Sequence, residues 1–177
     1  HIKIYTDPEI LKPEEKGQLI VEYDAVEKND WGYAHDRIYL LVNEKNVPNN
    51  RLTVSARITE DFSGLTQEER ANAPKITFED RTFNFGVIKQ GESVEHEFTF
   101  SNKGKSNLII RKTKASCGCT ASSPKDKIIE PGKSSVISAK FNSRGRKGSQ
   151  NKTITVITND PDNPMIRLKI TGQIKES

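Results

Sequence analysis

The sequence is poor in the residues that build several common protein classes. It contains 2 cysteines, 1 methionine and 1 tryptophan among 177 residues, and only 7% of its residues are aromatic. So few cysteines cannot supply the disulfide framework of a small secreted scaffold. The longest unbroken apolar run is residues 38–42, far short of the roughly 20 residues that a membrane-spanning helix needs. A membrane channel, a collagen or coiled-coil fibre and a disulfide-rich miniprotein are therefore excluded.

The N-terminus has no recognisable leader segment. The chain starts at His1 rather than at methionine, and no basic stretch followed by an apolar run and small residues is present there. We therefore expect a processed or trimmed product from which an export signal, together with any lipid anchor, has been removed.

Charge is distributed unevenly along the chain. The formal net charge is +4, but residues 1–74 carry −5 and residues 75–177 carry +9. The simplest interpretation is two solvated domains of different charge, and the alternative is a basic face for an anionic partner. The basic turn of Arg144, Arg146 and Lys147 lacks the interleaved aromatic residues that stack on single-stranded bases. We expect no nucleic-acid binding.

Alternating apolar and polar residues predict short β-strands over most of the second half. Val94, His96, Phe98 and Phe100 alternate with polar residues, and this period of two places them on one buried strand face. On that face, His96 is more simply a satisfied, partly buried histidine than a ligand. Further strands are expected at residues 76–78, 82–88, 108–110, 135–141, 153–158 and 166–174. About seven short strands in roughly 100 residues predict an antiparallel sandwich of the immunoglobulin type over residues 76–177.

Between the halves, residues 60–75 are predicted to form a linker with one short helix. Thr66 and Glu69 have the spacing of a capping box, in which each side chain satisfies a backbone N–H of the first helical turn. Good helix formers follow up to Ala73, and Pro74 ends them.

The two halves share an internal repeat. Residues 13–24 match residues 131–142 at a constant offset of 118, and the offset becomes 116 after Gly32. At the second offset, residues 38–58 match residues 154–174 at several asparagine, proline, leucine and isoleucine positions. A constant offset across a strand–turn–strand pattern indicates a tandem duplication.

The first copy is incomplete, because residues 76–118 have no counterpart in residues 1–59. We therefore predict an all-β chain of tandem immunoglobulin-like antiparallel β-sandwiches, the first of which lacks its N-terminal strands and keeps only about its last three. Three strands with one apolar face cannot cover themselves. Either upstream strands have been lost, or a partner chain or a neighbouring copy supplies them. In the last case the protein would be a homo-oligomer through its incomplete first domain.

The two cysteines form the motif Cys117-Gly118-Cys119. A disulfide between residues two apart is strained and labile, although Gly118 provides backbone freedom. The simplest interpretation is a packing or turn feature, with the thiols either reduced or bonded. One alternative is a redox or disulfide-exchange site, with Lys112 and Lys114 lowering a thiol pKa. The other is capture of a soft metal by two thiolates, which is the weakest because the three histidines lie far away in sequence.

No signature of a common catalytic or nucleotide-binding site is present. The sequence has no glycine-rich phosphate loop, zinc-protease motif, nucleophile elbow or calcium-binding loop. Residues 160–164 are superficially similar to a calcium loop, but their prolines and short span favour a hairpin turn. Trp31 lies in a turn between strands, where it either plugs the end of a sandwich or stacks on a ligand. For carbohydrate binding, Tyr33 and Tyr39 would join it.

The second half carries a set of recognisable short strings. They are Phe83-Asn84-Phe85-Gly86-Val87-Ile88, Gln90-Gly91-Glu92, Phe98-Thr99-Phe100, Asn102-Lys103-Gly104, Leu108-Ile109-Ile110, Ser116-Cys117-Gly118-Cys119-Thr120, Pro131-Gly132 and Thr158-Asn159. In these strings residues 76–174 resemble domain-of-unknown-function family 1573, which is common in Bacteroidetes, often as exported proteins or lipoproteins. The resemblance implies a seven-stranded immunoglobulin-like sandwich, related to domains of ciliary and centrosomal proteins, and a location in the envelope. It implies no reaction.

These features favour a non-enzymatic protein of the periplasm or cell surface of a Gram-negative bacterium. We expect it to bind a protein partner or to act as a structural spacer, through sheet faces, edges or end loops. We expect no cofactor, no metal and no membrane span. The candidate site residues are Cys117 and Cys119 for redox or metal chemistry, and Trp31, Thr120, Arg144, Arg146 and Lys147 for partner binding. The alternative function is a thiol redox or soft-metal-handling module.

Overall fold

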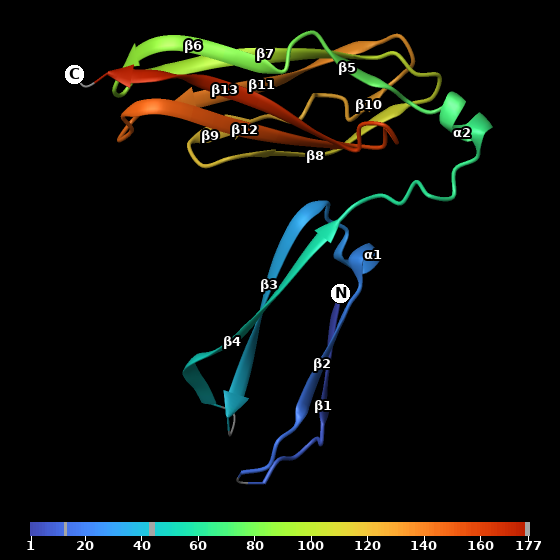
Figure 1. Cartoon of the computed structure of the whole chain (residues 1–177), viewed down its shortest axis with the longest axis vertical. Helices are drawn as coiled ribbons and strands as arrows, with labels where there is room; N and C mark the ends of the chain where they lie inside the picture. Colours follow the sequence, from blue (N-terminus) through green and yellow to red (C-terminus); the bar gives the residue numbers. More distant parts are fainter. Residues whose placement is uncertain (13, 43–44, 176–177) are drawn as a thin grey trace. The chain divides into compact units, whose positions relative to one another are not determined.

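The computed structural model describes residues 1–12, 14–42 and 45–175 (Figure 1). These residues form an all-β structure with two short helices. The chain divides into two units, His1–Ile58 and Thr59–Ser177. Within the described ranges, no helix is long and apolar enough to cross a membrane.

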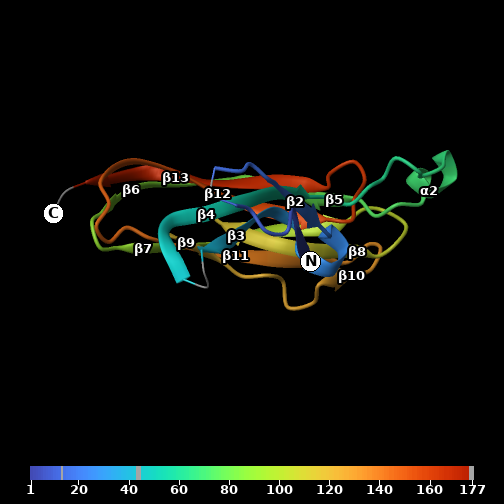
Figure 2. The same cartoon turned by 90° about the horizontal axis from the view of Figure 1, so that it is seen from below.

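The second unit is a two-layered, β-sandwich-like structure. Its strands are β5 (Ile76–Phe78), β6 (Thr82–Lys89), β7 (Ser93–Asn102), β8 (Leu108–Ala115), β9 (Cys119–Ala121), β10 (Ile128–Ile129), β11 (Ser134–Asn142), β12 (Gly148–Thr158) and β13 (Met165–Lys175). One sheet has the order β10-β8-β12-β13-β6, and the other has the order β5-β7-β11-β9. The two sheets lie face to face (Figures 1 and 2).

The core of the second unit lies between the sheets and follows the alternation of the strands. Phe98 and Phe100 of β7 are fully buried, and so are Phe141 of β11 and Leu168 of β13. Burying one such side chain contributes roughly 1.5–3 kcal/mol. The predicted strand at residues 94–100, with one buried face, is therefore confirmed.

His96 lies on this buried face, as predicted, but its ring is not fully satisfied. The ring stacks on Phe83 with centroids 4.2 Å apart and meets Phe98 edge-on at 4.6 Å. Its Nε2 atom lies 3.5 Å from Asp80 Oδ1 and makes no hydrogen bond to any described residue. Aromatic packing therefore accounts for the position of His96 in the strand.

One strand pairing departs from the predicted antiparallel arrangement. β6 runs parallel to β13, from Thr82 opposite Lys169 to Lys89 opposite Lys175. The first long strand of the unit therefore lies beside its last strand, at the edge of the larger sheet. Alternation of apolar residues sets which face of β6 is buried, but it carries no information about the direction of the neighbouring strand.

The predicted linker helix is present as α2 (Gln67–Ala71). Thr66 is its N-cap, and both hydrogen bonds of the capping box with Glu69 are formed. Just before the helix, Glu60 forms an ion pair with Arg111 of β8, in which Arg111 Nη2 lies 3.0 Å from Glu60 Oε1. α2 lies at the opposite end of the second unit from the end of β13 (Figures 1 and 2). The ion pair between Glu60 and Arg111 attaches the linker to the second unit.

The first unit consists of two separate two-stranded antiparallel sheets. Its elements are β1 (Ile2–Asp7), β2 (Gln18–Tyr23), α1 (Ala25–Lys28), β3 (Gly32–Val42) and β4 (Lys45–Ile58). The repeat predicts about three strands in this unit, whereas the structure has four. The additional strand is β1, which pairs with β2. The buried apolar residues of the described unit are few, namely Ala34, Ile38 and Ile58.

A polar cluster joins the two hairpins of the first unit. Asp36 of β3 accepts hydrogen bonds from the Lys28 ammonium at 2.6 Å and from the Tyr23 hydroxyl of β2 at 2.9 Å. These donors, Lys28 first, hold the pKa of Asp36 below its ordinary value, and Asp36 in turn raises the pKa of Lys28. Polar contacts therefore hold the hairpins together beside a small core.

The β3–β4 hairpin repeats the register of the β12–β13 hairpin. Gly32 faces Ile58 as Gly148 faces Ile174, and the eight consecutive pairs that begin there recur 116 residues later. β12 and β13 also pair with β8 and β6, whereas β3 and β4 have no further strand neighbour among the described residues. The second offset of the sequence repeat thus corresponds to the same hairpin in space.

Candidate functional site

The two cysteines lie on a tight turn between β8 and β9. The Cys119 N–H donates to the Ser116 carbonyl oxygen at 3.1 Å, and Gly118 has a φ of +91°. A positive φ at the third position is typical of a type II turn, where glycine is favoured. Cys117 and Cys119 therefore occupy the second and fourth positions of the turn.

Hydrogen bonds tie this turn to both sheets of the second unit. The Ser116 N–H donates to the Thr153 carbonyl at 2.9 Å, and the Ser116 hydroxyl accepts from the Thr153 N–H at 3.1 Å. The Gly118 carbonyl accepts from the Asn142 N–H at 3.3 Å. Thr153 belongs to β12 and Asn142 to β11, which lie in different sheets. The turn thus bridges the two layers.

Both cysteines carry free thiols, with Cys117 exposed and Cys119 partly buried. Burial raises the pKa of Cys119, and the charges of Lys152 and Arg146 only partly oppose this effect. A raised pKa leaves little thiolate at neutral pH, and the thiolate is the nucleophilic and metal-binding form. The environment of Cys119 therefore favours a structural role over disulfide exchange.

The cations that act on Cys119 differ from those that the sequence indicates. Neighbours in sequence suggest Lys112 and Lys114, but the structure brings Lys152 and Arg146 to the thiol instead. The reason is that β8 extends away from the turn and carries both lysines into its pairing with β12.

Arg146 lies across the cysteine turn. A Cβ atom at position 118 would collide with the Arg146 guanidinium, which occupies the space beside the glycine. The Arg146 carbonyl accepts a hydrogen bond from Gln90 Nε2 at 3.1 Å. Arg144 and Lys147 are exposed on the same turn. Two predicted features, the basic turn and the cysteine motif, therefore form one surface region.

The other predicted site residues lie elsewhere. Thr120 is exposed on β9 and lines a hollow on the outer face of the smaller sheet, together with Glu95 and Lys140. Trp31 belongs to the first unit, is partly buried, and donates its backbone N–H to the Asp30 carboxylate at 2.7 Å. Of the partner-binding candidates, Arg146 places its guanidinium against the cysteine turn, beside Gly118.

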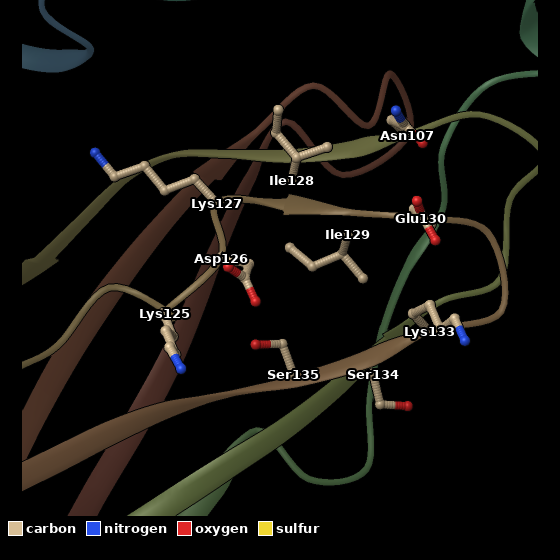
Figure 3. Close-up of a pocket in the computed structure, with 10 residues that line it drawn as sticks. All are labelled: Asn107, Lys125, Asp126, Lys127, Ile128, Ile129, Glu130, Lys133, Ser134 and Ser135. Atoms are coloured by element: carbon tan, nitrogen blue, oxygen red, sulfur yellow. The ribbon is translucent and has the colours of Figure 1, made fainter.

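A hollow that no sequence motif indicates lies between β10 and the start of β11. Its volume is about 720 Å³. Ile129 and the Asp126 carboxylate lie between the two strands, whereas the Lys127 and Lys133 side chains point away (Figure 3). Nine of its ten lining residues lie within residues 125–135, and Asn107 completes the lining.

The Asn102 side chain makes four hydrogen bonds in the second unit, where the residue is 0% exposed. Its side-chain oxygen accepts from the backbone N–H groups of Lys75 and Gly104, at 3.2 and 3.0 Å. Its amide nitrogen donates to the carbonyls of Ser106 and Ile129, at 2.8 and 2.9 Å. Asn102 therefore fastens β10 and the segment before β5 to the end of β7.

Asp160 has a similar role in the turn after β12. Its carboxylate is 1% exposed and accepts hydrogen bonds from the backbone N–H groups of Ile76, Asp162 and Asn163 and from the Asn163 side chain. Residues 160–164 thus form the predicted hairpin turn between β12 and β13. Across residues 1–12, 14–42 and 45–175, no group of three or more His, Cys, Asp or Glu side chains could hold a metal ion.

Comparison with sequence families assigns the β-sandwich. The profile described as "Protein of unknown function (DUF1573)" matches residues 76–174, which is more than half of the chain. The chain belongs to the DUF1573 family. The DUF1573 match begins with β5 and ends within β13, so it coincides with the two-layered structure of the second unit. No curated protein matches the chain significantly.

The solved structures that match the DUF1573 chain differ in how well they superpose on it. A protein of unknown function from Porphyromonas gingivalis W83 matches 96% of this chain and 79% of its own, with a TM-score of 0.63 and 17% identity. The ASH/PapD-like domain 7 of human CEP192 matches 69% of this chain and 98% of its own, with a TM-score of 0.46 and 13% identity. The Vibrio cholerae VesB protease matches 60% of this chain and 33% of its own, with a TM-score of 0.44 and 14% identity. The first likeness shows a shared fold.

Most of the exposed hydrophobic side chains of the first unit are not among the site residues predicted from the sequence. Of the twelve large hydrophobic residues that are exposed in the described structure, ten lie in the first unit and only Val87 and Ile128 lie in the second. The available signal was the incomplete repeat, which leaves hydrophobic strands with too few neighbours to cover them.

Proposed function

We propose that the chain is a non-enzymatic module that binds a partner protein or spaces other domains, and that it consists of tandem immunoglobulin-like sandwiches of which the first is incomplete. The observation that carries this proposal is the concentration of exposed large hydrophobic side chains in the first unit, ten of twelve. Concentrated apolar exposure marks interaction surfaces. The family resemblance supports a place in the periplasm or at the cell surface.

The open sheets of the first unit support this proposal. A two-stranded sheet alone is marginally stable in water, and its edges present unpaired backbone groups. In the second unit, the repeat counterparts β11, β12 and β13 have β7, β8 and β6 as additional neighbours. Strand addition by a partner protein would supply the neighbours that the first unit lacks.

The second unit suits a rigid support rather than a reaction site. Asn102 and Asp160 use their side chains to fasten loops and strand ends. Gly104 is required for the same packing, because a Cβ atom there would collide with the backbone of Ala73 and Lys75. These side chains fix the fold and leave the surface available for binding.

The alternative is a thiol redox or soft-metal-handling module centred on Cys117 and Cys119. An exposed turn that carries two free thiols beside the Arg146 guanidinium favours it. The raised pKa of Cys119 opposes it, because disulfide exchange and metal binding both need the thiolate.

Capture of a partner from the envelope fraction of the source cells tests these two functions against each other. The bait is the full chain, so that both units keep their context. Each variant replaces a pair of side chains and leaves the fully buried core residues unchanged. The baits are the wild type, Tyr5→Ser/Ile20→Ser, Tyr33→Ser/Tyr39→Ser, Val87→Ser/Ile128→Ser and Cys117→Ser/Cys119→Ser.

We expect the wild type to capture one partner reproducibly, as measured by quantitative mass spectrometry. At least one of the two first-unit variants should capture roughly tenfold less, because a few central aromatic or apolar side chains carry most of the binding energy of an interface. The second-unit variant and the cysteine variant should capture as much as the wild type. Loss of capture with the cysteine variant alone would instead support the thiol function.

A further inference from the structure

The outer face of the β3–β4 hairpin carries a distinctive set of exposed side chains. Along the eight shared pairs, every second residue of each strand points to this face and is exposed. The outward residues of β3 are Tyr33, His35, Arg37 and Tyr39, and those opposite them on β4 are Arg57, Ser55, Thr53 and Arg51. We call these eight residues the Tyr/Arg face.

Strand geometry separates this face from the core. Gly32, Ala34 and Ile38 alternate with the outward residues of β3 and are buried. Tyr33 and Tyr39, in contrast, are 53% and 52% exposed. Tyr33 and Tyr39 are six positions apart in the strand, which places them about 20 Å apart along an extended backbone. The face is therefore long enough to contact an extended segment of a partner.

The charges on the Tyr/Arg face are segregated. Residues 1–58 contain five lysines, three arginines and ten acidic residues. All three arginines lie on this face, whereas none of the lysines and none of the acidic residues do. A unit with an excess of acidic residues thus presents one face that is wholly cationic. Such a face is complementary to a negatively charged partner.

The choice of arginine over lysine is informative. A guanidinium binds a carboxylate through two parallel hydrogen bonds and stacks on aromatic rings, whereas an ammonium does neither as well. The Arg57 guanidinium lies over the Tyr33 ring, 5.8 Å from its centroid. His35 Nδ1 lies 2.9 Å from the Ser55 hydroxyl across the strands. These cross-strand contacts order side chains that face solvent.

The fold itself does not require the outward residues of β3. In the equivalent hairpin of the second unit, the positions of Tyr33, His35, Arg37 and Tyr39 are taken by small polar residues. They are Ser149, Asn151, Thr153 and Thr155. The same register is formed with both sets, so the outward residues of β3 are not needed to form the hairpin. On the opposite strand, Arg167 and Lys169 stand at the positions of Arg51 and Thr53.

We propose that the Tyr/Arg face docks an acidic segment of the partner protein, with Asp or Glu carboxylates on the arginines and apolar contact on the tyrosine rings. Tyrosine and arginine are enriched among the residues that dominate protein interfaces. This inference rests on the proposed function and names the chemistry of its partner. A carboxylated polysaccharide and a nucleic acid are the competing ligand classes.

Fluorescence anisotropy with labelled poly-L-glutamate as the probe tests the proposal on the full chain. Sodium alginate and oligothymidine serve as the polysaccharide and nucleic-acid probes. The variants are Arg37→Gln/Arg51→Gln, Arg37→Lys/Arg51→Lys and Tyr33→Ser/Tyr39→Ser. The matched control is Lys125→Gln/Lys127→Gln, which removes the same charge from exposed positions of the second unit.

We expect poly-L-glutamate to bind the wild type more tightly than either competing probe. Arg37→Gln/Arg51→Gln should weaken binding of poly-L-glutamate roughly tenfold or more. The affinity of the lysine variant should lie between those of the glutamine variant and the wild type. The tyrosine variant should bind severalfold more weakly than the wild type. The control should lie within about twofold of the wild type, because only long-range charge changes.

Three results would overturn the inference. They are no poly-L-glutamate binding by the wild type, equal weakening by the control and the arginine variant, and tighter binding of alginate or oligothymidine through the same arginines. Each would leave the broader interaction role standing, because that role is tested by the cysteine and first-unit variants in the capture experiment. Equal circular dichroism spectra of all variants would show that lost binding is not lost folding.

Discussion

Asp160→Ala should lower the free energy of unfolding of the second unit by about 4 kcal/mol, because hydrogen bonds to a charged group contribute roughly 1.5–3 kcal/mol each and are not additive. The buried carboxylate accepts four hydrogen bonds, including one from the Ile76 N–H at the start of β5. Alanine would leave three backbone N–H groups buried or partly buried without their acceptor. Urea unfolding of the full chain, followed by far-ultraviolet circular dichroism, measures the loss.

Asp162→Ala is the matched control for this prediction. Asp162 lies two residues away in the same turn and is exposed, so its replacement should change the free energy of unfolding by less than about 0.5 kcal/mol. The fluorescence of Trp31, the single tryptophan, follows the first unit separately. Equal stability of Asp160→Ala and Asp162→Ala would show that the Asp160 carboxylate is not the acceptor that fixes β5.

Asn102→Ala should cost about 3 kcal/mol, because it would leave two backbone N–H groups and two carbonyls without their partner in the interior. Asn102→Asp should cost at least as much, although it has nearly the same shape. A carboxylate would keep the acceptor for Lys75 and Gly104, but it would face the carbonyl oxygens of Ser106 and Ile129 that now receive N–H donors.

The same unfolding experiment measures both Asn102 variants, with Asn151→Ala as control. Asn151 is exposed on β12 opposite Thr171, and its replacement should be nearly neutral. If Asn102→Asp were as stable as the wild type at neutral pH, the donors to Ser106 and Ile129 would contribute nothing, and the structural role assigned to this residue would be wrong.

Patterns of neighbouring residues predict those elements of the fold that depend on interactions close in sequence. The alternation from Val94 to Phe100 predicts β7 and its buried face, and the spacing of Thr66 and Glu69 predicts the capping box of α2. β10, in contrast, has two residues, Ile128 and Ile129, which is too short for a period to be read. It exists because β8 offers an edge, and no local pattern records the neighbour.

Long-range contacts explain what sequence reasoning could not find in the site. The turn at residues 160–164 is visible from its prolines, but the Asp160 acceptor for Ile76 spans 84 residues. The Arg146 guanidinium lies beside Gly118 because the chain through β9, β10 and β11 returns residue 146 to the cysteine turn. Tyr33 and Tyr39 are visible as candidates, whereas their alignment with Arg57 and Arg51 depends on the register of β3 and β4.

Backbone nuclear Overhauser contacts in the full chain test the shared register most directly. We expect cross-strand contacts that place Ala34 opposite Ala56, and the same pattern 116 residues later, with Gln150 opposite Gly172. The tandem architecture and the Tyr/Arg face both depend on this pairing. A shift of one residue between β3 and β4 would contradict it, because such a shift would place Arg51 and Arg57 on the opposite face of the hairpin from Tyr33 and Tyr39.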